Sequence, residues 1–241
     1  MSDLALVDGF FATPHRFVWH AASRTAICSD LHLGIESSLA DAGIPLPSSS
    51  TNTLAAWQHI TARNPAHIVV AGDLFDSAAP GESAIEMFRN LLAVLPSDCP
   101  VTLTPGNHDP SADLLADVLP ELLIRPARVV GGYTVTHGHK LPPELRSAGN
   151  LIVGHQHPAI VLRSRVQSAK MFCYAEISTP MRHLLILPPF SRTPLGTHLL
   201  TDHHWILDLP RPSDKNIRIL GLIEPKNRDA QILDFGPVAF L

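Results

Sequence analysis

The sequence predicts a single α/β domain, residues 1–241, in which two β-sheets pack face to face with helices outside. Strand-like runs alternate with helical patterns up to about residue 120, whereas the rest of the chain reads mainly as strands. A chain of 241 residues can bury a sizeable core in one such domain. Its 45% hydrophobic and 17% charged residues are typical of globular proteins.

The first half of the chain alternates between the two kinds of element. Strands are expected at residues 17–20, 25–29, 67–71 and 101–104. Helices are expected at residues 51–63, 81–95 and 111–119. In the second helix, Phe88, Leu92 and Leu95 fall on one face at helical spacing. Ser111 is placed to cap the third helix and Pro120 to end it.

The second half is expected to be rich in strands. These strands are expected at residues 129–136, 151–153, 159–165, 170–177, 183–187, 204–209, 218–223 and 231–235. Many of the 22 prolines lie between these runs, as is usual for strand ends and turns. The apolar run at residues 233–241 is expected to pack on the protein's own core, with a contact between two copies as the alternative. The chain is therefore expected to be a monomer or a homodimer.

Composition excludes several classes of protein. No apolar run reaches the length of about 20 residues that a transmembrane helix needs. The first residues have neither the basic region nor the apolar core of a signal peptide. We therefore expect a cytoplasmic protein without a membrane partner. Cys28, Cys99 and Cys173 lack metal-ligand spacing and are expected to be reduced core residues.

Charge is distributed unevenly along the chain. Residues 1–124 hold 4 Lys and Arg against 14 Asp and Glu, whereas residues 125–241 hold 14 against 8. The two parts therefore carry −10 and +6, which sum to the −4 of the whole chain. Such asymmetry can mark a surface that meets an anionic polymer. The alternative is that solvated side chains fall unevenly by chance.

Five short segments carry side chains that bind metal ions, and each segment follows a strand-like run. They are Asp30-Leu31-His32, Gly72-Asp73, Gly106-Asn107-His108-Asp109, His137-Gly138-His139 and Gly154-His155-Gln156-His157. The loops beyond the carboxyl ends of neighbouring strands meet at one edge of a sheet, so we expect these side chains to converge. The glycines in these segments allow tight turns and close backbone approach.

The types of ligand indicate a two-metal hydrolytic centre. Carboxylate, amide and imidazole ligands suit Mn, Fe, Zn or Ni, and we expect Mn(II) to support activity in vitro. Asp73 can place one carboxylate oxygen on each ion, and Asn107 adds a neutral oxygen. Two ions about 3.5–4 Å apart can activate a bridging hydroxide and stabilise an in-line displacement. His108 is placed to donate a proton to the leaving oxygen.

The set and order of these motifs resemble the calcineurin-like metallophosphoesterase superfamily, whose pattern is D-x-H, G-D-x-x-D, G-N-H-D/E, H and G-H-x-H. The motifs span residues 30–157. Further segments, at residues 30–34, 42–47, 157–160 and 187–191, resemble the small bacterial and archaeal branch that contains the DNA ligase-associated phosphoesterases. That branch often carries His where this chain has Asp76, the residue of the wider superfamily.

The resemblance implies a four-layer α/β/β/α sandwich of two mixed sheets with flanking helices. It implies one metal site made of Asp30, His32, Asp73 and His157, and another made of Asp73, Asn107, His137 and His155. His108 resembles the catalytic histidine of the family, and Asp76, Asp109 and His139 resemble residues that surround and orient the ligands. Both His137 and His139 can reach a metal ion, and His137 is the ligand by analogy.

Three functions stay open from the sequence. The first is a metal-dependent phosphodiesterase or nuclease acting on DNA or a nucleotide, for which the resemblance implies DNA-repair proteins as partners. Arg163 and Arg165, in the positive second half, are expected to contact substrate phosphates. The second is a phosphatase or diesterase of a small nucleotide or metabolite. The third is a catalytically inactive scaffold of the same fold, which is disfavoured because every ligand position of the pattern is filled.

Overall fold

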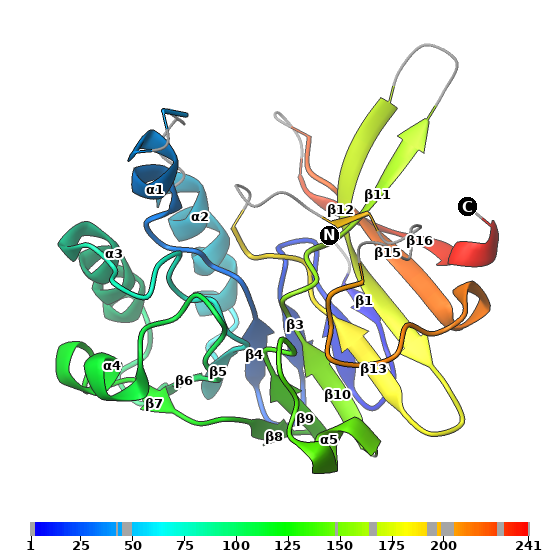
Figure 1. Ribbon diagram of the computed structural model, residues 1–241, viewed down its shortest axis with the longest axis horizontal. Helices are drawn as coiled ribbons and strands as arrows, with labels where there is room; N and C mark the ends of the chain where they lie inside the picture. The colour runs from blue at the N-terminus through cyan, green and yellow to red at the C-terminus, as the bar shows by residue number, and fades with distance from the viewer. Residues whose placement is uncertain are drawn as a thin grey trace.

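Two β-sheets lie face to face in the computed structural model of the chain (Figure 1). The structure describes residues 3–41, 43–44, 50–147, 149–163, 168–191, 197–198, 205–225 and 229–240. The predicted α/β class, with two mixed sheets and flanking helices, is confirmed. None of the helices in these ranges is long and apolar enough to cross a membrane.

The first sheet contains seven strands among the described residues, in chain order. They are β1 (Leu4–Ala5), β2 (Phe10–Ala12), β3 (Val18–His20), β4 (Thr25–Cys28), β5 (His67–Val70), β6 (Val101–Leu103) and β7 (Leu123–Ile124). Strands β1 to β4 pair antiparallel, and β4 to β7 pair parallel. The carboxyl ends of β4, β5 and β6 therefore lie at the same edge of the sheet.

Helices connect the parallel strands and cover the outer face of this sheet, on the left in Figure 1. They are α1 (Ile35–Asp41), α2 (Ser50–Thr61), α3 (Glu82–Ala93) and α4 (Ala112–Val118). Trp57 of α2 and Phe88 of α3 are fully buried in the cluster that they share with strand residues such as Val70. The Ser111 hydroxyl accepts the Leu114 N–H at 3.3 Å, which confirms the predicted cap of α4.

The second sheet contains nine strands in the described part of the chain. They are β8 (Arg128–Val130), β9 (Tyr133–Thr136), β10 (Asn150–Val153), β11 (Pro158–Arg163), β12 (Ser168–Ser178), β13 (His183–Ile186), β14 (Thr197–His198), β15 (Ile217–Ile223) and β16 (Gln231–Pro237). Strand β10 runs parallel to its neighbours β9 and β13, whereas β12 pairs antiparallel with β11, β13 and β15. The carboxyl ends of β9 and β10 therefore also lie together.

Successive side chains of the central strands enter different layers. Ile27, Val69 and Ile152 lie in the core between the two sheets. Their neighbour Val70 faces the helices, and Val153 faces the outer side of the second sheet. This period of two follows from strand geometry. It explains why these strands are apolar at nearly every position, since both of their faces are buried.

Short helices and irregular chain cover the outer face of the second sheet. The short elements are α5 (Pro143–Ser147), η2 (Asp214–Asn216) and η3 (Val238–Phe240). Leu207 and the buried Val238 join the core cluster on this face, so the C-terminal run packs on the protein's own core at Val238. The strand predicted at residues 204–209 is wrong for residues 205–209, where the chain bends, while residue 204 lies outside the described ranges.

A second prediction is also wrong, because residues 129–136 form two strands instead of one. Strands β8 and β9 pair antiparallel around Gly131 and Gly132. These glycines have φ of +53° and +82°, as a two-residue hairpin loop requires. The elements β1, β2, α1, β7, β14 and α5 were not predicted. The remaining predicted elements are present with small differences at their ends, except that residues 164–165 of the strand predicted at 159–165 lie outside the described residues. All three cysteines are buried and free, as expected.

Candidate metal centre

The predicted ligands lie in the loops that follow the carboxyl ends of strands from both sheets. Asp30, Asp73 and Asn107 follow β4, β5 and β6 of the first sheet, and His137 and His155 follow β9 and β10 of the second. The His155 N–H lies 3.2 Å from each carboxylate oxygen of Asp30, which joins the two sheets at this edge. The predicted convergence of the five segments is therefore present.

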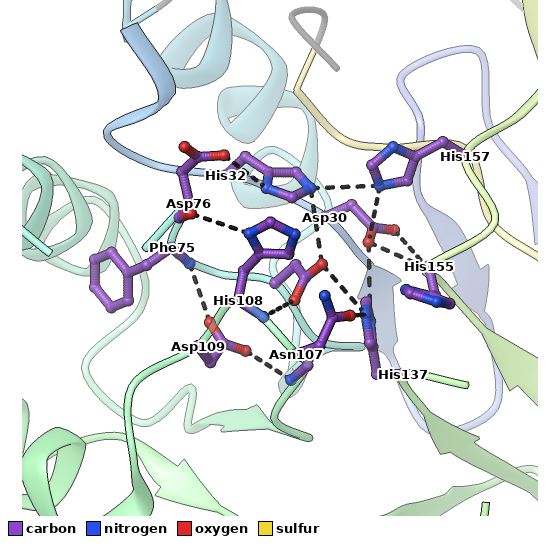
Figure 2. A network of polar contacts seen from close by, with 12 residues as sticks. Asp30, His32, Phe75, Asp76, Asn107, His108, Asp109, His137, His155 and His157 are labelled. Atoms are coloured by element: carbon purple, nitrogen blue, oxygen red, sulfur yellow. Dashed lines mark hydrogen bonds and ion pairs between the residues drawn. The ribbon is translucent and has the colours of Figure 1, made fainter. Parts of the chain in front are cut away.

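Asp30, His32 and His157 form the first cluster (Figure 2). The Asp30 Oδ1 atom lies 3.1 Å from His157 Nε2, and His32 Nε2 lies 3.4 Å from the same nitrogen. Asp30 is fully buried and His32 nearly so. The Asp30 carboxylate faces imidazole groups, with His157 at 3.1 Å and His137 at 3.8 Å.

Asp73, His137 and His155 form the second cluster. His137 Nε2 lies 3.2 Å from Asp73 Oδ2 and 3.2 Å from Asn107 Oδ1, so the amide of Asn107 belongs to the same group. The His137 Nδ1–H donates to the Ala71 carbonyl at 2.9 Å. That contact holds the ring in place and turns its other nitrogen, Nε2, toward the cluster.

Asp73 lies between the two clusters. Its Oδ2 atom is 3.2 Å from His137 Nε2 and 3.9 Å from His32 Nε2, so this single oxygen faces both groups of imidazoles. Its Oδ1 atom accepts the backbone N–H of His108 at 2.9 Å. Oδ2 is therefore the Asp73 atom that faces both clusters, whereas Oδ1 is bonded to the backbone of the loop after β6.

The spacing of the donor atoms fits divalent ions. An ion with ligands at about 2.0–2.2 Å places adjacent ligand atoms roughly 3.0–3.5 Å apart. The contacts of 3.1 and 3.4 Å in the first cluster and 3.2 Å in the second lie in this range. In each cluster the ligand atoms lie within 4.8 Å of one another. Both the donor chemistry and the geometry therefore suit a metal ion in each cluster.

His108 lies beside the clusters and is exposed to solvent. Its Nδ1–H donates to the backbone carbonyl of Asp76 at 3.0 Å, which directs Nε2 away from that carbonyl. The Asp76 carboxylate lies 3.2 Å from His32 Nδ1. His32, Asp76 and His108 also form a group that could hold an ion. We interpret the Asp76 contact as orienting His32, because it leaves His32 Nε2 free for the first cluster.

Asp109 connects two of the metal-binding loops. Its carboxylate accepts the Phe75 N–H at 3.1 Å and the Gly106 N–H at 2.8 Å. Burial raises the pKa of Asp109, although these two hydrogen bonds lower it. The side chain thus holds the loop after β5 against the loop after β6, next to Asp73 and Asn107.

His139 lies beside the second cluster and is not a member of it. Its ring centroid is 5.2 Å from that of His137 and 6.0 Å from that of His155. Its buried Nδ1 atom has no hydrogen-bond partner among the described residues. The arrangement therefore favours His137 over His139 as the ligand. Arg163 ends β11 with its side chain outside the described residues, and Arg165 lies outside them altogether.

The backbone is left-handed at many of the predicted ligands. Residues Asp30, His32, Asp73, His155 and His157 have φ of +54°, +46°, +48°, +64° and +44°. This conformation is uncommon for residues other than glycine and clusters at functional sites. It bends the chain sharply after each strand and turns the ligands of neighbouring segments toward one another.

The close packing of the loops requires two glycines. A Cβ atom at Gly72, where φ is +81°, would lie 2.2 Å from His137 Nδ1. A Cβ atom at Gly106 would lie 2.1 Å from Asp73 Oδ1. The predicted role of these glycines in close approach is therefore confirmed.

Electrostatics favour ionised carboxylates in the centre. Burial by itself would raise the pKa of Asp30, but His157, His137 and His32 hold it well below its usual range. Burial lowers the pKa of His137, yet its hydrogen bond with Asp73 and the charges of Asp30 and Asp73 raise it to about 9. Burial and the charge of His137 lower the pKa of His155 to about 4. Cations bound here would supply the positive charge that these ionised carboxylates favour.

Arg16 supports the site, a role that the sequence did not predict. This Arg is 2% exposed and donates to the carbonyls of Pro189 and Ser191 at 3.0 and 2.9 Å. The Ser191 N–H in turn donates to the Asp30 carbonyl at 3.3 Å. Arg16 thus holds the loop after β13 against the backbone of Asp30. Its partners are about 175 positions away, so no local pattern could have identified it.

Comparison with known proteins agrees with this architecture. Residues 23–159 match the family described as calcineurin-like phosphoesterase. The crystal structure of nuclease MPE from Pseudomonas putida shares 21% identity, covers 88% of this chain and 91% of its own, and has a TM-score of 0.60. A double mutant of Vps29 from Entamoeba histolytica shares 12% identity over 76% of this chain and 89% of its own, with a TM-score of 0.33. No sequence among the curated proteins matches. The family match spans more than half of the chain and contains every predicted ligand, so the chain belongs to the calcineurin-like phosphoesterase family.

Proposed function

We propose that this phosphoesterase is a binuclear metal-dependent phosphodiesterase that acts as a nuclease. The observation that carries the proposal is the position of Asp73 Oδ2 between the two clusters, 3.2 Å from His137 Nε2 and 3.9 Å from His32 Nε2. One carboxylate shared by two imidazole-rich groups is the arrangement that a pair of divalent ions needs. We expect Mn(II) to support activity in vitro, and the ligands also suit Fe, Zn or Ni.

The protein's own groups have separable roles in this proposal. Divalent ions held by the two clusters would supply Lewis-acid activation of water and neutralise charge on the phosphate oxygens. Asp73, held by the His108 N–H through Oδ1, sets the separation of the two clusters. The imidazole of His108 is anchored through Nδ1 by the Asp76 carbonyl, so its Nε2–H is the group that can protonate the leaving oxygen.

Two features support nucleic acid as the substrate. The second half of the chain carries +6, and its described Lys and Arg side chains include Lys140, Arg146, Lys170 and Arg182. Such residues can neutralise backbone phosphates. One solved structure with the same fold is named a nuclease. DNA-repair proteins are then the expected partners.

Cleavage of DNA tests the proposal. Metal-loaded protein at low salt is expected to cut plasmid or oligonucleotide DNA, and Asp73→Asn is expected to lose this activity. Asp113→Asn, an exposed Asp on α4, makes the same chemical change away from the centre and is expected to keep full activity. Removal of His108 by His108→Ala is expected to lower kcat by about 10²–10⁴ with DNA. Metal-loaded protein that cuts no nucleic acid would overturn the nuclease assignment.

Two measurements distinguish the proposed nuclease from the two alternative functions. A nitrophenyl monoester hydrolysed much faster than the bis-ester would indicate a phosphatase for a small nucleotide or metabolite. A protein that binds no metal ion and hydrolyses neither ester after addition of Mn(II) would be an inactive scaffold. We expect two bound ions and preference for the diester.

A further inference from the structure

The segment of residues 205–209 contacts two loops that carry candidate metal ligands. One is the loop after β9, which contains His137, and the other is the loop after β10, which contains His155. The segment bends instead of forming a strand, and the Trp205 indole N–H donates to the Leu209 carbonyl at 2.6 Å. This bond holds the two ends of the segment together, so the residues between them reach the metal-binding loops as one unit.

Gln156 joins the segment to the loop after β10. Its side chain is fully buried, and its Oε1 atom accepts the Ile206 N–H at 2.9 Å. Gln156 lies between His155 and His157 in the sequence, and these two residues belong to different candidate clusters. The backbone is left-handed at both histidines, with φ of +64° and +44°. The chain therefore bends at each ligand, and the side chain between them anchors it to the segment.

Asp208 joins the segment to the loop after β9. Its backbone N–H donates to the Gly138 carbonyl at 3.2 Å, and its carboxylate accepts the Leu141 N–H at 2.9 Å. The same carboxylate pairs with Arg146 at 2.6 Å. Gly138 directly follows His137 in the sequence, so these contacts hold the chain next to that ligand.

Packing supports the same connection. Leu207 is buried in one cluster with Leu141 and Val153. A Cβ atom at Gly138, where φ is +102°, would lie 3.0 Å from Leu207 Cδ2 and 3.1 Å from Val153 Cβ. Both the segment and strand β10 therefore lie directly against the loop after β9.

The two candidate clusters depend on these loops to different degrees. The first cluster takes one of its three residues, His157, from a loop of the second sheet. The second cluster takes two of three, His137 and His155. The Gly154 N–H donates to the His137 carbonyl at 3.1 Å, so the two loops also meet directly, and the segment adds a second connection between them. The placement of the two loops relative to each other therefore matters most for the second cluster.

We propose that Gln156 and Asp208 are positioning residues of the metal centre, and that residues 205–209 set the separation of His137 and His155. Both roles presuppose the proposed binuclear function, and neither residue is itself a candidate ligand. Loss of the Asp208 carboxylate is expected to weaken binding of the ion in the second cluster. Loss of the Gln156 acceptor is expected to weaken binding of both ions, because this residue lies between one ligand of each cluster.

Three substitutions test the two contacts. Asp208→Ala removes the acceptor of the Leu141 N–H, whereas Asp208→Asn keeps an oxygen that can accept this bond. Gln156→Met keeps a buried side chain of similar shape and removes the acceptor of the Ile206 N–H. Asp208→Asn is therefore expected to recover most of what Asp208→Ala loses.

Asp214→Ala is the matched control. Asp214 pairs with Arg211 at 2.6 Å, the same distance as that between Asp208 and Arg146, and both carboxylates are partly exposed. Asp214 begins η2 and pairs with an arginine three residues before it, so its loss breaks a similar ion pair that lies outside the segment.

Titration of the metal-free full-length protein with Mn(II), followed by calorimetry and electron paramagnetic resonance, gives the affinity of each ion. Two ions about 3.5–4 Å apart couple magnetically, whereas a single bound ion gives an uncoupled signal. His137→Gln, which lacks a ligand of the second cluster, gives the reference signal for an ion in the first cluster alone.

The expected pattern is selective. Asp208→Ala is expected to bind the second ion about tenfold more weakly, at the lower end of the effect of residues that orient ligands, and the first ion within about twofold of wild type. Its uncoupled signal should match that of His137→Gln and persist to higher Mn(II) concentrations than in wild type. Gln156→Met is expected to bind both ions about tenfold more weakly. Asp208→Asn should stay within about threefold of wild type, and Asp214→Ala should match it.

Other outcomes would overturn these roles. Asp208→Ala that binds both ions as wild type does, or that loses affinity for both ions equally, would refute the role of Asp208. An equal loss in Asp214→Ala would refute it as well. Circular dichroism of the metal-free proteins shows whether each variant folds, and if Asp208→Ala does not, Gln156→Met still tests the segment. Wild-type protein that binds fewer than two ions would refute the proposed binuclear function itself. Wild-type protein that binds two, with Asp208→Ala and Gln156→Met unchanged, would refute only the positioning roles.

Discussion

Replacement of Gly72 by Ala tests how the backbone holds the metal ligands. A Cβ atom there would lie 2.2 Å from His137 Nδ1 and 2.3 Å from His137 Cγ. Nδ1 is the atom that donates to the Ala71 carbonyl at 2.9 Å. The added methyl group therefore has to displace the imidazole ring or break the contact that orients it.

The expected loss of unfolding free energy in Gly72→Ala has two parts. A residue other than glycine at positive φ costs about 1–2 kcal/mol, and the overpacked methyl group costs about 1–3 kcal/mol more. Gly72→Ala is therefore expected to lose about 2–5 kcal/mol of unfolding free energy. Loss of the orienting contact should also weaken binding of one metal ion by about 10–100-fold.

Gly132 provides a matched control. Its φ is +82°, against +81° at Gly72, and an added Cβ atom would meet nothing within 4 Å. Gly132→Ala is thus expected to lose only the backbone contribution of about 1–2 kcal/mol and to bind both ions normally. Denaturant unfolding gives the free energies, and titration with Mn(II) followed by metal analysis gives the affinities. The same stability and the same metal content in both variants would refute the close-approach argument.

Three further changes have defined outcomes. His137→Gln is expected to lose one of two bound Mn(II) equivalents while His139→Gln keeps both, and metal analysis showing the reverse would make His139 the ligand. Asp109→Asn removes charged acceptors for the N–H groups of two loops and is expected to lower the unfolding free energy by about 1–3 kcal/mol in denaturant titrations; an unchanged midpoint would contradict the role of Asp109. Glu176 is bonded to His183 and to the partly exposed Arg218, and these bonds hold the pKa of Glu176 below its usual range despite its burial. This stabilisation is present above the ordinary carboxyl pKa of about 4.3 and is lost as pH falls through the lowered native pKa. Glu176→Gln should therefore lose about 1–2 kcal/mol of unfolding free energy at pH 7, after allowance for solvent screening at Arg218. The difference in unfolding free energy from wild type should be smaller near pH 3. A difference that stays constant with pH would contradict this origin of the stabilisation.

Local pattern was sufficient to predict where the candidate ligands gather. Asp30, Asp73 and Asn107 each follow a β-branched apolar run, and parallel strands bring their carboxyl ends to one edge. The distinction between His137 and His139 was not available locally, because both lie on the same short segment. It depends on the Ala71 carbonyl, which comes from the other sheet.

The errors in the predicted fold also have physical reasons. Residues 205–209 are apolar enough to read as a strand, but the Ile206 N–H is bonded to the Gln156 side chain at 2.9 Å instead of a neighbouring strand. The run from 129 to 136 is apolar on both sides of Gly131 and Gly132, and their left-handed φ values end the first strand. Arg16 depends on partners brought to it by the second sheet, so its role required the tertiary structure.

We propose that Asp73 joins two metal ions held by separate clusters. The most direct measurement is anomalous diffraction from crystals of the wild-type protein grown with Mn(II). We expect two peaks on either side of Asp73 Oδ2, about 3.5–4 Å apart, one bounded by Asp30, His32 and His157 and the other by Asn107, His137 and His155. A single peak, or peaks bound by other residues, would contradict the binuclear centre.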